Sequence, residues 1–300
     1  MKCKYLTALA LGLWMLPVQA NTLHGCMDSA ECKSMQEAAK QGDANAQFNL
    51  GICYALGQGV SKDVTEAMKW WQKAANQGHA EAQFNLGIGY ANGRGVNKDA
   101  AEAVKWYREA AKQGYAQAQY NLGCCYAVGE GVSKDVTEAM KWYREAAKQG
   151  YARAQFNLGI GYANGKGVNK DAAEAVRWYR KAANQDYAPA QFNLGVCYDD
   201  GKGISKDDVE AVEWYRKAAN QGYAQAQCFL GLSYFFGEGV SQDDVEAVKW
   251  LRKAANQGEK DAMKYLILCY EKGIGVEKDV QQAQKLRMQE TAGSLPNTQR

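Results

Sequence analysis

The residues that enzymes and metalloproteins use most are scarce in this sequence. Histidine occurs only twice, at His24 and His79, which is too few and too scattered for a metal site or a histidine-dependent triad. No serine has lysine three residues later, Lys-Thr-Gly is absent, and the phosphate-binding pattern Gly-x-x-x-x-Gly-Lys-[Ser/Thr] does not occur. We therefore expect no catalytic residue, no metal ligand and no cofactor, and we interpret both histidines as structural or surface residues.

An excess of one charge is also missing. The 36 Lys and Arg residues are balanced by 33 Asp and Glu residues, which leaves a formal net charge of +3. A protein that binds nucleic acid needs a basic face. The composition therefore argues against a nucleic-acid partner.

Long apolar runs are confined to the first twenty residues. Lys2 and Lys4 precede an apolar stretch at 6–18, and Val18-Gln19-Ala20 supplies the small residues that signal peptidase recognises. We interpret residues 1–20 as a secretory signal peptide cleaved after Ala20, because the stretch is too short for a transmembrane helix. No later segment could span a bilayer, so we expect a periplasmic or secreted mature chain that does not insert into a membrane.

An internal repeat of 36 residues accounts for most of the chain. The hexapeptide Ala-Gln-Phe-Asn-Leu-Gly begins at Ala46 and returns with small changes at Ala82, Ala118, Ala154, Ala190 and Ala226. This period predicts six repeats in residues 43–258, numbered 1 to 6 below. Residues 259–292 form a degenerate seventh repeat that caps the C-terminus, residues 21–42 an N-terminal capping helix, and residues 293–300 a flexible tail.

Each repeat is expected to form two helices, named helix A and helix B. In repeat 1, helix A is predicted over about 44–56, and Gly57 and Gly59 mark the turn that follows it. Asp63 then caps helix B, and Glu66 completes an acidic version of the capping box.

A glycine recurs inside every helix A, as Gly51 in repeat 1, where it costs up to about 1 kcal/mol relative to alanine. This cost predicts a close approach of helix B. We expect the large side chains that fill this space to be a row of tryptophans: Trp70, Trp106, Trp142, Trp178, Trp214 and Trp250.

These elements together resemble the Sel1-like repeat family, which is related to the tetratricopeptide repeat. The resemblance covers about residues 43–290 and rests on the hexapeptide, Gly57-x-Gly59, Asp63 and Trp70, repeated in register. It implies an all-α fold, a right-handed α-solenoid of stacked antiparallel helix pairs with helix A on the concave face. One helix pair cannot bury its apolar faces alone, so the stack supplies a continuous core.

A second period of 72 residues lies over the first. Segment 59–68 is identical to 131–140, and segment 95–104 is identical to 167–176. We infer that a pair of repeats was duplicated, with cysteine and glycine alternating at one position of helix A.

Helix A has a second face that carries aromatic and amide side chains. On a helical wheel, Phe48 and Ile52 lie opposite Ala46, and Asn49 lies beside them. Apolar pockets edged by amides suit an extended peptide, whose backbone the asparagines would bind. The candidate binding residues are Phe48, Asn49, Phe84, Asn85, Tyr120, Asn121, Phe156, Asn157, Phe192 and Asn193.

The alternative is that this row packs helix A against the next repeat. Replacement of Phe84, Phe156 and Asn121 together distinguishes binding from packing. If the row binds a partner, the variant loses the partner and keeps its thermal stability; if the row packs the core, the variant loses stability. The later repeats carry Asp199, Asp200, Phe235 and Phe236 near the end of helix A. We therefore expect specificity to reside in the C-terminal third.

The mature chain has eight cysteines, and an even number in an exported protein suggests disulfides. Four of them recur at one helix A position in alternate repeats: Cys53, Cys125, Cys197 and Cys269. Equivalent points two repeats apart lie about 20 Å apart, which exceeds the reach of a disulfide. The cysteine-rich branch of the family joins helix A to helix B, but helix B here has no cysteine. Cys26 with Cys32 is the one pair we consider, and we interpret the others as small buried hydrophobes, with thiol chemistry as the alternative.

These features predict a non-catalytic scaffold or adaptor of the bacterial cell envelope that binds a protein or extended peptide along helix A. The oligomeric state and the partner's identity are not encoded in any pattern we find. The alternative function is a β-lactamase-like or penicillin-binding hydrolase, which the resemblance to cysteine-rich family members implies and the missing Ser-x-x-Lys opposes.

Overall fold

The computed structural model describes residues 29–292, which form parts of two compact units, Met1–Ala146 and Ala147–Arg300. The predictions for the signal peptide, for His24 and for the tail lie outside the described residues. The proposed Cys26–Cys32 pair also lies outside the described side chains.

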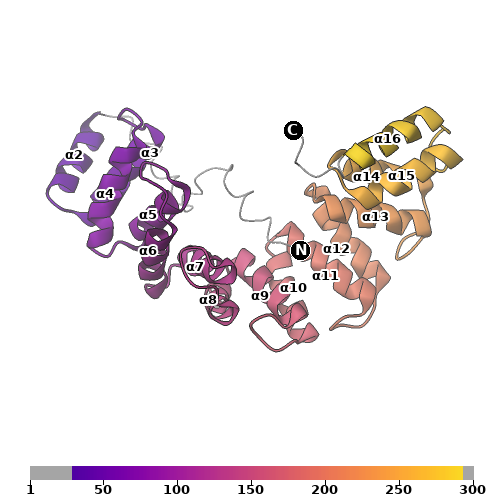
Figure 1. The fold of residues 1–300 in the computed structure, drawn as a ribbon, viewed down its shortest axis with the longest axis horizontal. Helices are drawn as coiled ribbons and strands as arrows, with labels where there is room; N and C mark the ends of the chain where they lie inside the picture. Colours follow the sequence, from indigo (N-terminus) through magenta and orange to yellow (C-terminus); the bar gives the residue numbers. More distant parts are fainter. Residues whose placement is uncertain (1–28, 293–300) are drawn as a thin grey trace. The chain divides into compact units, whose positions relative to one another are not determined.

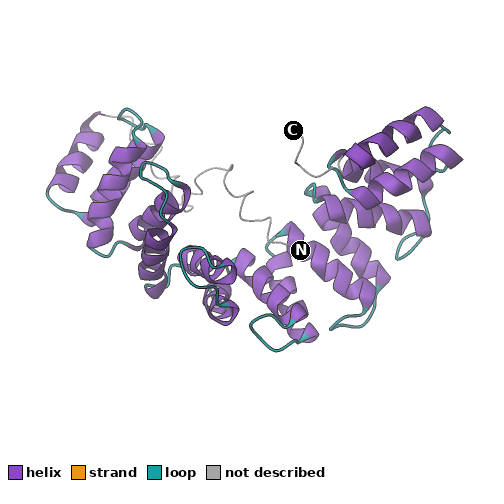
Figure 2. Cartoon of the chain, viewed as in Figure 1, coloured by secondary structure: helices purple, strands orange, loops and turns teal. Residues whose placement is uncertain are grey.

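Helices α2 to α16 make up the described chain, and no strand occurs between residues 29 and 292, so this part is all-α as predicted (Figure 2). The N-terminal unit holds α2 (Ser29–Lys40), α3 (Ala44–Leu56), α4 (Val64–Asn76), α5 (Ala80–Asn92), α6 (Ala100–Lys112), α7 (Ala116–Val128) and most of α8 (Val136–Lys148). The C-terminal unit holds α9 (Ala152–Asn164), α10 (Ala172–Ala183), α11 (Ala188–Asp200), α12 (Asp208–Asn220), α13 (Ala224–Phe236), α14 (Asp244–Asn256), α15 (Lys260–Lys272) and α16 (Val280–Ala292).

From α3 onward, odd-numbered helices are helix A and even-numbered helices are helix B. Within each unit successive helices pack side by side as stacked pairs (Figure 1). The predicted bounds of helix A in repeat 1 are confirmed by α3, which ends at Gly57 in the left-handed conformation.

Helix B begins at a capping aspartate, as predicted. The Asp63 carboxylate accepts a hydrogen bond from the Glu66 backbone N–H at 3.0 Å, which satisfies a donor that the first helical turn leaves free. The Glu66 carboxylate pairs with Lys69 at 2.8 Å instead of completing a capping box. The cap is therefore an aspartate cap supported by an exposed ion pair.

The second glycine of the A–B turn lies against the preceding repeat. Gly131 has φ of 70°, and a Cβ there would overlap the carbonyl oxygen of Ala100 and lie 2.9 Å from the Ala101 nitrogen, at the start of α6. Gly95 shows the same arrangement, with a built Cβ 2.6 Å from the Val64 carbonyl oxygen. Neighbouring repeats therefore touch backbone to backbone at this edge.

The glycine inside helix A does face helix B closely, but the predicted partner was wrong. A Cβ on Gly87 would lie 2.5 Å from the ring of Tyr107, not against Trp106. At 100° per residue, the side chain that follows the tryptophan points at helix A, and the tryptophan itself points to the side. The residues that take this place in the described helices are Trp71, Tyr107, Tyr143, Tyr179, Tyr215 and Leu251.

The tryptophan row joins each repeat to the one before it. Trp106 packs on the core cluster of Met68, Trp71 and Leu86, and Trp214 packs in the same way on the cluster that holds Tyr179. The tryptophans therefore contribute to the stacking of repeats rather than to the packing within one helix pair.

A buried glutamine holds the ends of the helices together in every repeat. In repeat 5, the Gln191 amide donates to the Ala183 carbonyl at 3.2 Å and its oxygen accepts from Gln221 at 2.7 Å. Burial of an amide is stabilising only when its donors and acceptors are paired, and here both groups are paired. The same bond to the preceding helix B is made by Gln47, Gln83, Gln119, Gln155 and Gln227.

Where helix B of one repeat meets helix A of the next, the sizes of the two facing side chains alternate along the chain. Met68 of helix B in repeat 1 faces Gly89 of the next helix A, where a Cβ would lie 2.5 Å from the Met68 sulfur. In the following contact the smaller Val104 packs in one cluster with Cys125, which occupies the position equivalent to Gly89. A large side chain therefore meets a glycine, and a small side chain meets a cysteine.

Candidate binding surfaces

The structure places the predicted aromatic row partly inside the stack. Phe84 is 7% exposed and Phe48 is also buried, whereas Tyr120, Phe156 and Phe192 are half-buried. The Phe156 ring lies 5.9 Å from the ring of Tyr179 and 5.4 Å from that of Tyr187. Aromatic pairs at such distances stabilise packing, so the rings of this row support helix B and the start of the next repeat.

Two asparagines of the row bond tyrosines of the preceding helix B. Asn121 donates a hydrogen bond to the Tyr107 hydroxyl, and Asn193 does the same for Tyr179. Burial is the main cause that raises the pKa of Tyr107 and Tyr179, and the asparagine bond opposes it. Asn49, Asn121, Asn157 and Asn193 are half-buried, while Asn85 is buried. The amides of Asn121 and Asn193 are thus already used in part inside the protein.

The contact between repeats 5 and 6 lacks this asparagine bond, and another hydrogen bond takes its place. Phe229 stands where the other repeats have asparagine, and its ring packs 5.3 Å from that of Tyr215. The Tyr215 hydroxyl instead donates to the Asp199 carboxylate at 3.0 Å. We predicted from the sequence that Asp199 contributes to specificity. In the structure Asp199 is half-buried, and its bond to Tyr215 gives it a structural role.

An aliphatic row lies next to the asparagines on helix A, and Ile160, Val196 and Leu232 of this row also pack against the core clusters. Its members in the C-terminal unit are Ile160, Val196, Leu232 and Leu268, and all are half-buried. They occupy one position of successive A helices, α9, α11, α13 and α15. We call these four residues with Asn157 and Asn193 the helix A row.

His79 is the N-cap of α5 and stacks on Phe48, with ring centroids 4.5 Å apart. Its Nδ1 accepts the Ala82 backbone N–H at 3.3 Å, which requires the neutral ring. Burial lowers the pKa of His79 below its ordinary value, although Glu81, 3.3 Å away, opposes that shift.

A pH-dependent stability should follow from this histidine. Because its folded pKa is lowered, the unfolded chain binds the proton more readily, so stability present above about pH 6.5 is lost as the pH falls below that value. Thermal unfolding midpoints compared at about pH 7.5 and about pH 5 should fall further for the wild type than for His79→Tyr. His24 is common to both proteins, so an equal pH dependence of the two would contradict this role of His79.

Cys228 and Cys269 are buried and Cys125 and Cys197 are half-buried, in surroundings that suit apolar side chains. Cys125, Cys197, Cys228 and Cys269 form no disulfide in the structure. Burial raises the pKa of the Cys125 thiol to about 12 and that of Cys197 to about 11. A thiol is reactive as the thiolate, so this environment opposes thiol chemistry at these positions.

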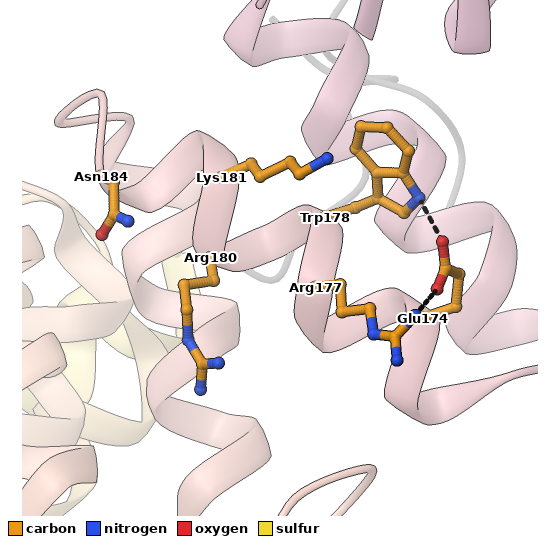
Figure 3. Close-up of a pocket in the computed structure, with 6 residues that line it drawn as sticks. All are labelled: Glu174, Arg177, Trp178, Arg180, Lys181 and Asn184. Atoms are coloured by element: carbon orange, nitrogen blue, oxygen red, sulfur yellow. Dashed lines mark hydrogen bonds and ion pairs between the residues drawn. The ribbon is translucent and has the colours of Figure 1, made fainter. Parts of the chain in front are cut away.

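The outer face of α10 carries a shallow hollow of about 350 Å³ beside Trp178 (Figure 3). Glu174 accepts from the Trp178 indole at 3.1 Å and pairs with Arg177 at 3.2 Å, while the Lys181 ammonium lies 4.2 Å from the Trp178 ring centre. A similar hollow of about 300 Å³ lies beside Trp106 on α6. The one carboxylate of the α10 hollow is already paired, so the hollow offers no acid–base pair for catalysis.

Between residues 29 and 292, no group of three or more His, Cys, Asp or Glu side chains could hold a metal ion. In the same part of the chain, no helix has the length and apolar character needed to cross a membrane.

Stacked helix pairs that share a core from one repeat to the next define an α-solenoid. The family model of the Sel1 repeat matches residues 44–79, 80–115, 116–151, 152–187, 188–223, 224–259 and 261–286. The chain therefore belongs to the Sel1 repeat family, as the sequence pattern indicated. Sel1 repeat proteins are typically scaffolds for protein interactions and are generally non-catalytic.

Two solved structures illustrate the similarity. The chain is 36% identical to a protective antigen of uropathogenic Escherichia coli with an SLR fold, at a TM-score of 0.72, over 88% of this chain and 64% of that one. The chain thus spans less than two thirds of that antigen. It is 35% identical to a Sel1 repeat protein from Oxalobacter formigenes, at a TM-score of 0.74, over 85% of this chain and 99% of that one. No curated protein matches this chain.

Proposed function

We propose that this protein is a non-catalytic scaffold of the bacterial cell envelope that binds an extended segment of another protein along the helix A row. The observation that carries the proposal is the recurrence, on four successive A helices, of a half-buried aliphatic side chain at one position. Such a row repeats one small apolar site many times, which suits a partner without a fixed fold.

The spacing of the row limits the partner. Packed helices lie about 10 Å apart, and an extended chain advances about 3.3 Å per residue. One repeat therefore corresponds to about three residues of the bound segment. We expect the partner to present an apolar side chain at every third residue.

Selection from a random phage-displayed peptide library on the purified chain tests this function. The variant Ile160→Ser, Asn193→Ser, Val196→Ser should bind the selected peptides at least about tenfold more weakly than the wild type. The matched control, Arg177→Ser with Lys249→Ser on exposed positions of helix B, should bind them normally. Failure to enrich any peptide, or equal binding by the row variant, would overturn the proposal.

The substitution of Phe84 and Phe156 is not suited to this test. Because Phe84 is buried and the Phe156 ring supports two tyrosines, their loss should lower stability whatever the row binds. The row variant above alters half-buried side chains, and one of them, Asn193, bonds Tyr179. Its thermal midpoint is therefore measured beside that of the control, and binding is compared at a temperature well below both midpoints.

The envelope location rests on residues 1–20. Expression of the whole sequence in a Gram-negative bacterium should give a periplasmic chain that begins at Asn21, as read by N-terminal sequencing. A chain that keeps Met1 would contradict export. Nitrocefin turnover by the purified protein would contradict the non-catalytic assignment.

A further inference from the structure

The exposed large apolar side chains gather at one edge of the repeats. We define the A–B edge as the end of helix A, the turn and the start of helix B. Within the described side chains, all the exposed large apolar residues except Met288 lie on this edge: Leu56, Val128, Val209, Phe236, Val245 and Val280. The most exposed of them are in repeats 5 and 6, where Phe236 is 52%, Val209 61% and Val245 68% exposed.

The two valines of this set in repeats 5 and 6 are not needed for the packing of the solenoid. Val209 and Val245 occupy the second position of helix B, where repeats 1 and 3 have Thr65 and Thr137. Burial of an apolar side chain lowers the free energy of the folded state, whereas an exposed apolar side chain gives no such stabilisation. Their presence on the surface therefore calls for a reason outside the fold.

The three exposed side chains of repeats 5 and 6 belong to one continuous edge. The turn glycine Gly239, three residues after Phe236, lies against the backbone of α12 beside Val209, with a built Cβ 3.0 Å from the Val209 nitrogen. Phe236 also packs on Phe235 and Tyr265, with ring centroids 5.0 and 5.9 Å away. Exposed apolar side chains gathered on one edge in this way are typical of an interaction site.

The same edge is more acidic in these repeats than in repeats 1 to 4. Segment 199–210 has five carboxylates and two lysines, and segment 235–246 has four carboxylates and no cation. Their net charges are therefore −3 and −4. The equivalent segments of repeats 1 to 4 (55–66, 91–102, 127–138 and 163–174) have net charges between 0 and −2.

The protein itself neutralises the charge of repeat 6 only in part: Glu246 pairs with Lys249 at 3.0 Å, and Lys206 of repeat 5 lies within electrostatic reach of Glu238. In repeat 5, Lys206 pairs with Asp208 at 3.0 Å. In repeat 6 the position equivalent to Lys206 is occupied by Gln242, whose side-chain amide donates a hydrogen bond to Asp244 at 3.2 Å. Within residues 29–292, Glu238 and Asp244 make no ion pair, so the edge keeps a negative field beside Phe236 and Val245.

We infer that the A–B edge of repeats 5 and 6 docks a segment of another protein that carries both basic and apolar side chains. Lysine or arginine of the partner meets Glu238 and Asp244, and its apolar side chains cover Phe236 and the two valines. The negative field repels nucleic acid and anionic lipid, which excludes both as occupants. This surface is distinct from the helix A row and extends the proposed function to a second binding site.

A labelled peptide of alternating lysine and leucine is the probe for this surface, used with the full mature chain in a fluorescence-anisotropy titration. The control peptides alternate lysine with serine and glutamate with leucine. The lysine–leucine peptide should bind, and added salt should weaken it, because the contact is partly electrostatic. Equal binding of either control peptide would overturn the inference, since one lacks the apolar and the other the basic side chains.

Two edge variants locate the binding. Val209→Thr, Phe236→Asn, Val245→Thr introduces residues found at these positions in other repeats and removes the apolar surface. Glu238→Gln with Asp244→Ala removes the unpaired charge. Each should weaken lysine–leucine binding by about tenfold or more. The thermal midpoint of each variant is measured as well, and binding is compared well below it, because Phe236 contacts Tyr265 and Asp244 is half-buried.

A matched pair of controls separates this inference from the proposed function. Leu56→Ser with Val128→Ser alters exposed apolar residues on the same edge of earlier repeats. That variant and the helix A row variant should both bind the lysine–leucine peptide as the wild type does. Normal binding by the edge variants, or loss in the helix A row variant alone, would assign the peptide elsewhere and overturn the edge site.

Discussion

Replacement of Gly131 with alanine should lower the free energy of unfolding by about 3 kcal/mol or more, because two separate effects act at this position. The left-handed backbone, with φ of 70°, costs an L-residue about 1–2 kcal/mol. The new Cβ would also overlap the Ala100 carbonyl oxygen. Relief of overpacking by backbone shifts typically costs a further 1–3 kcal/mol or so. Urea unfolding of the whole chain measures the sum.

Gly114→Ala is the matched control for Gly131→Ala. Gly114 also has a left-handed backbone, with φ of 86°, but no atom lies within 4 Å of its built Cβ. Its replacement should therefore cost only the backbone strain of about 1–2 kcal/mol. Equal losses for the two variants would show that the contact between neighbouring repeats at the A–B edge contributes nothing.

Replacement of Gly89 with cysteine should lower the free energy of unfolding by about 2 kcal/mol, since the added side chain meets the buried Met68. The substitution places in repeat 2 the residue that repeat 3 has at Cys125. Met68→Val alone should cost about 1 kcal/mol, because it leaves a void above Gly89.

The double variant Met68→Val, Gly89→Cys should recover most of the loss. It recreates the Val104–Cys125 contact that the protein already uses one repeat later. A double-mutant cycle should therefore give a favourable interaction energy of about 1–2 kcal/mol. Additive losses would mean that the two side chains do not share one space.

The sequence predicted the helices well because their ends depend on local chemistry. Asp63 caps its own helix, and Gly57 supplies a left-handed residue that few other side chains adopt. Both signals act within a few residues of the chain. The same local logic, repeated in register, identified the family.

The partner of the helix A glycine could not be predicted in the same way. Trp70 and Trp71 are adjacent and both large, and only the crossing of two helices decides that Trp71 faces Gly51. The role of the buried glutamines was missed for a related reason. The acceptor of Gln191 is the Ala183 carbonyl at the end of another helix, and a carbonyl leaves no mark in a sequence.

The candidate site was predicted only in part. The helical wheel grouped Phe84 and Asn121 in one row, but it could not show that other side chains of the protein contact that row. Phe84 is buried and Asn121 is bound to Tyr107. The exposure of the valines of the A–B edge was not predicted from the sequence, because the exposure of a side chain depends on the neighbouring repeat.

The alternation of Met68 over Gly89 with Val104 beside Cys125 also limits how such a protein can change in length. Loss of a single repeat from this run would bring methionine against cysteine or valine against glycine, which gives either a clash or a void. Loss or gain of two repeats preserves every contact. The gene should therefore lengthen and shorten in steps of 72 residues, and natural variants of this chain should differ by an even number of repeats in the region where the alternation holds.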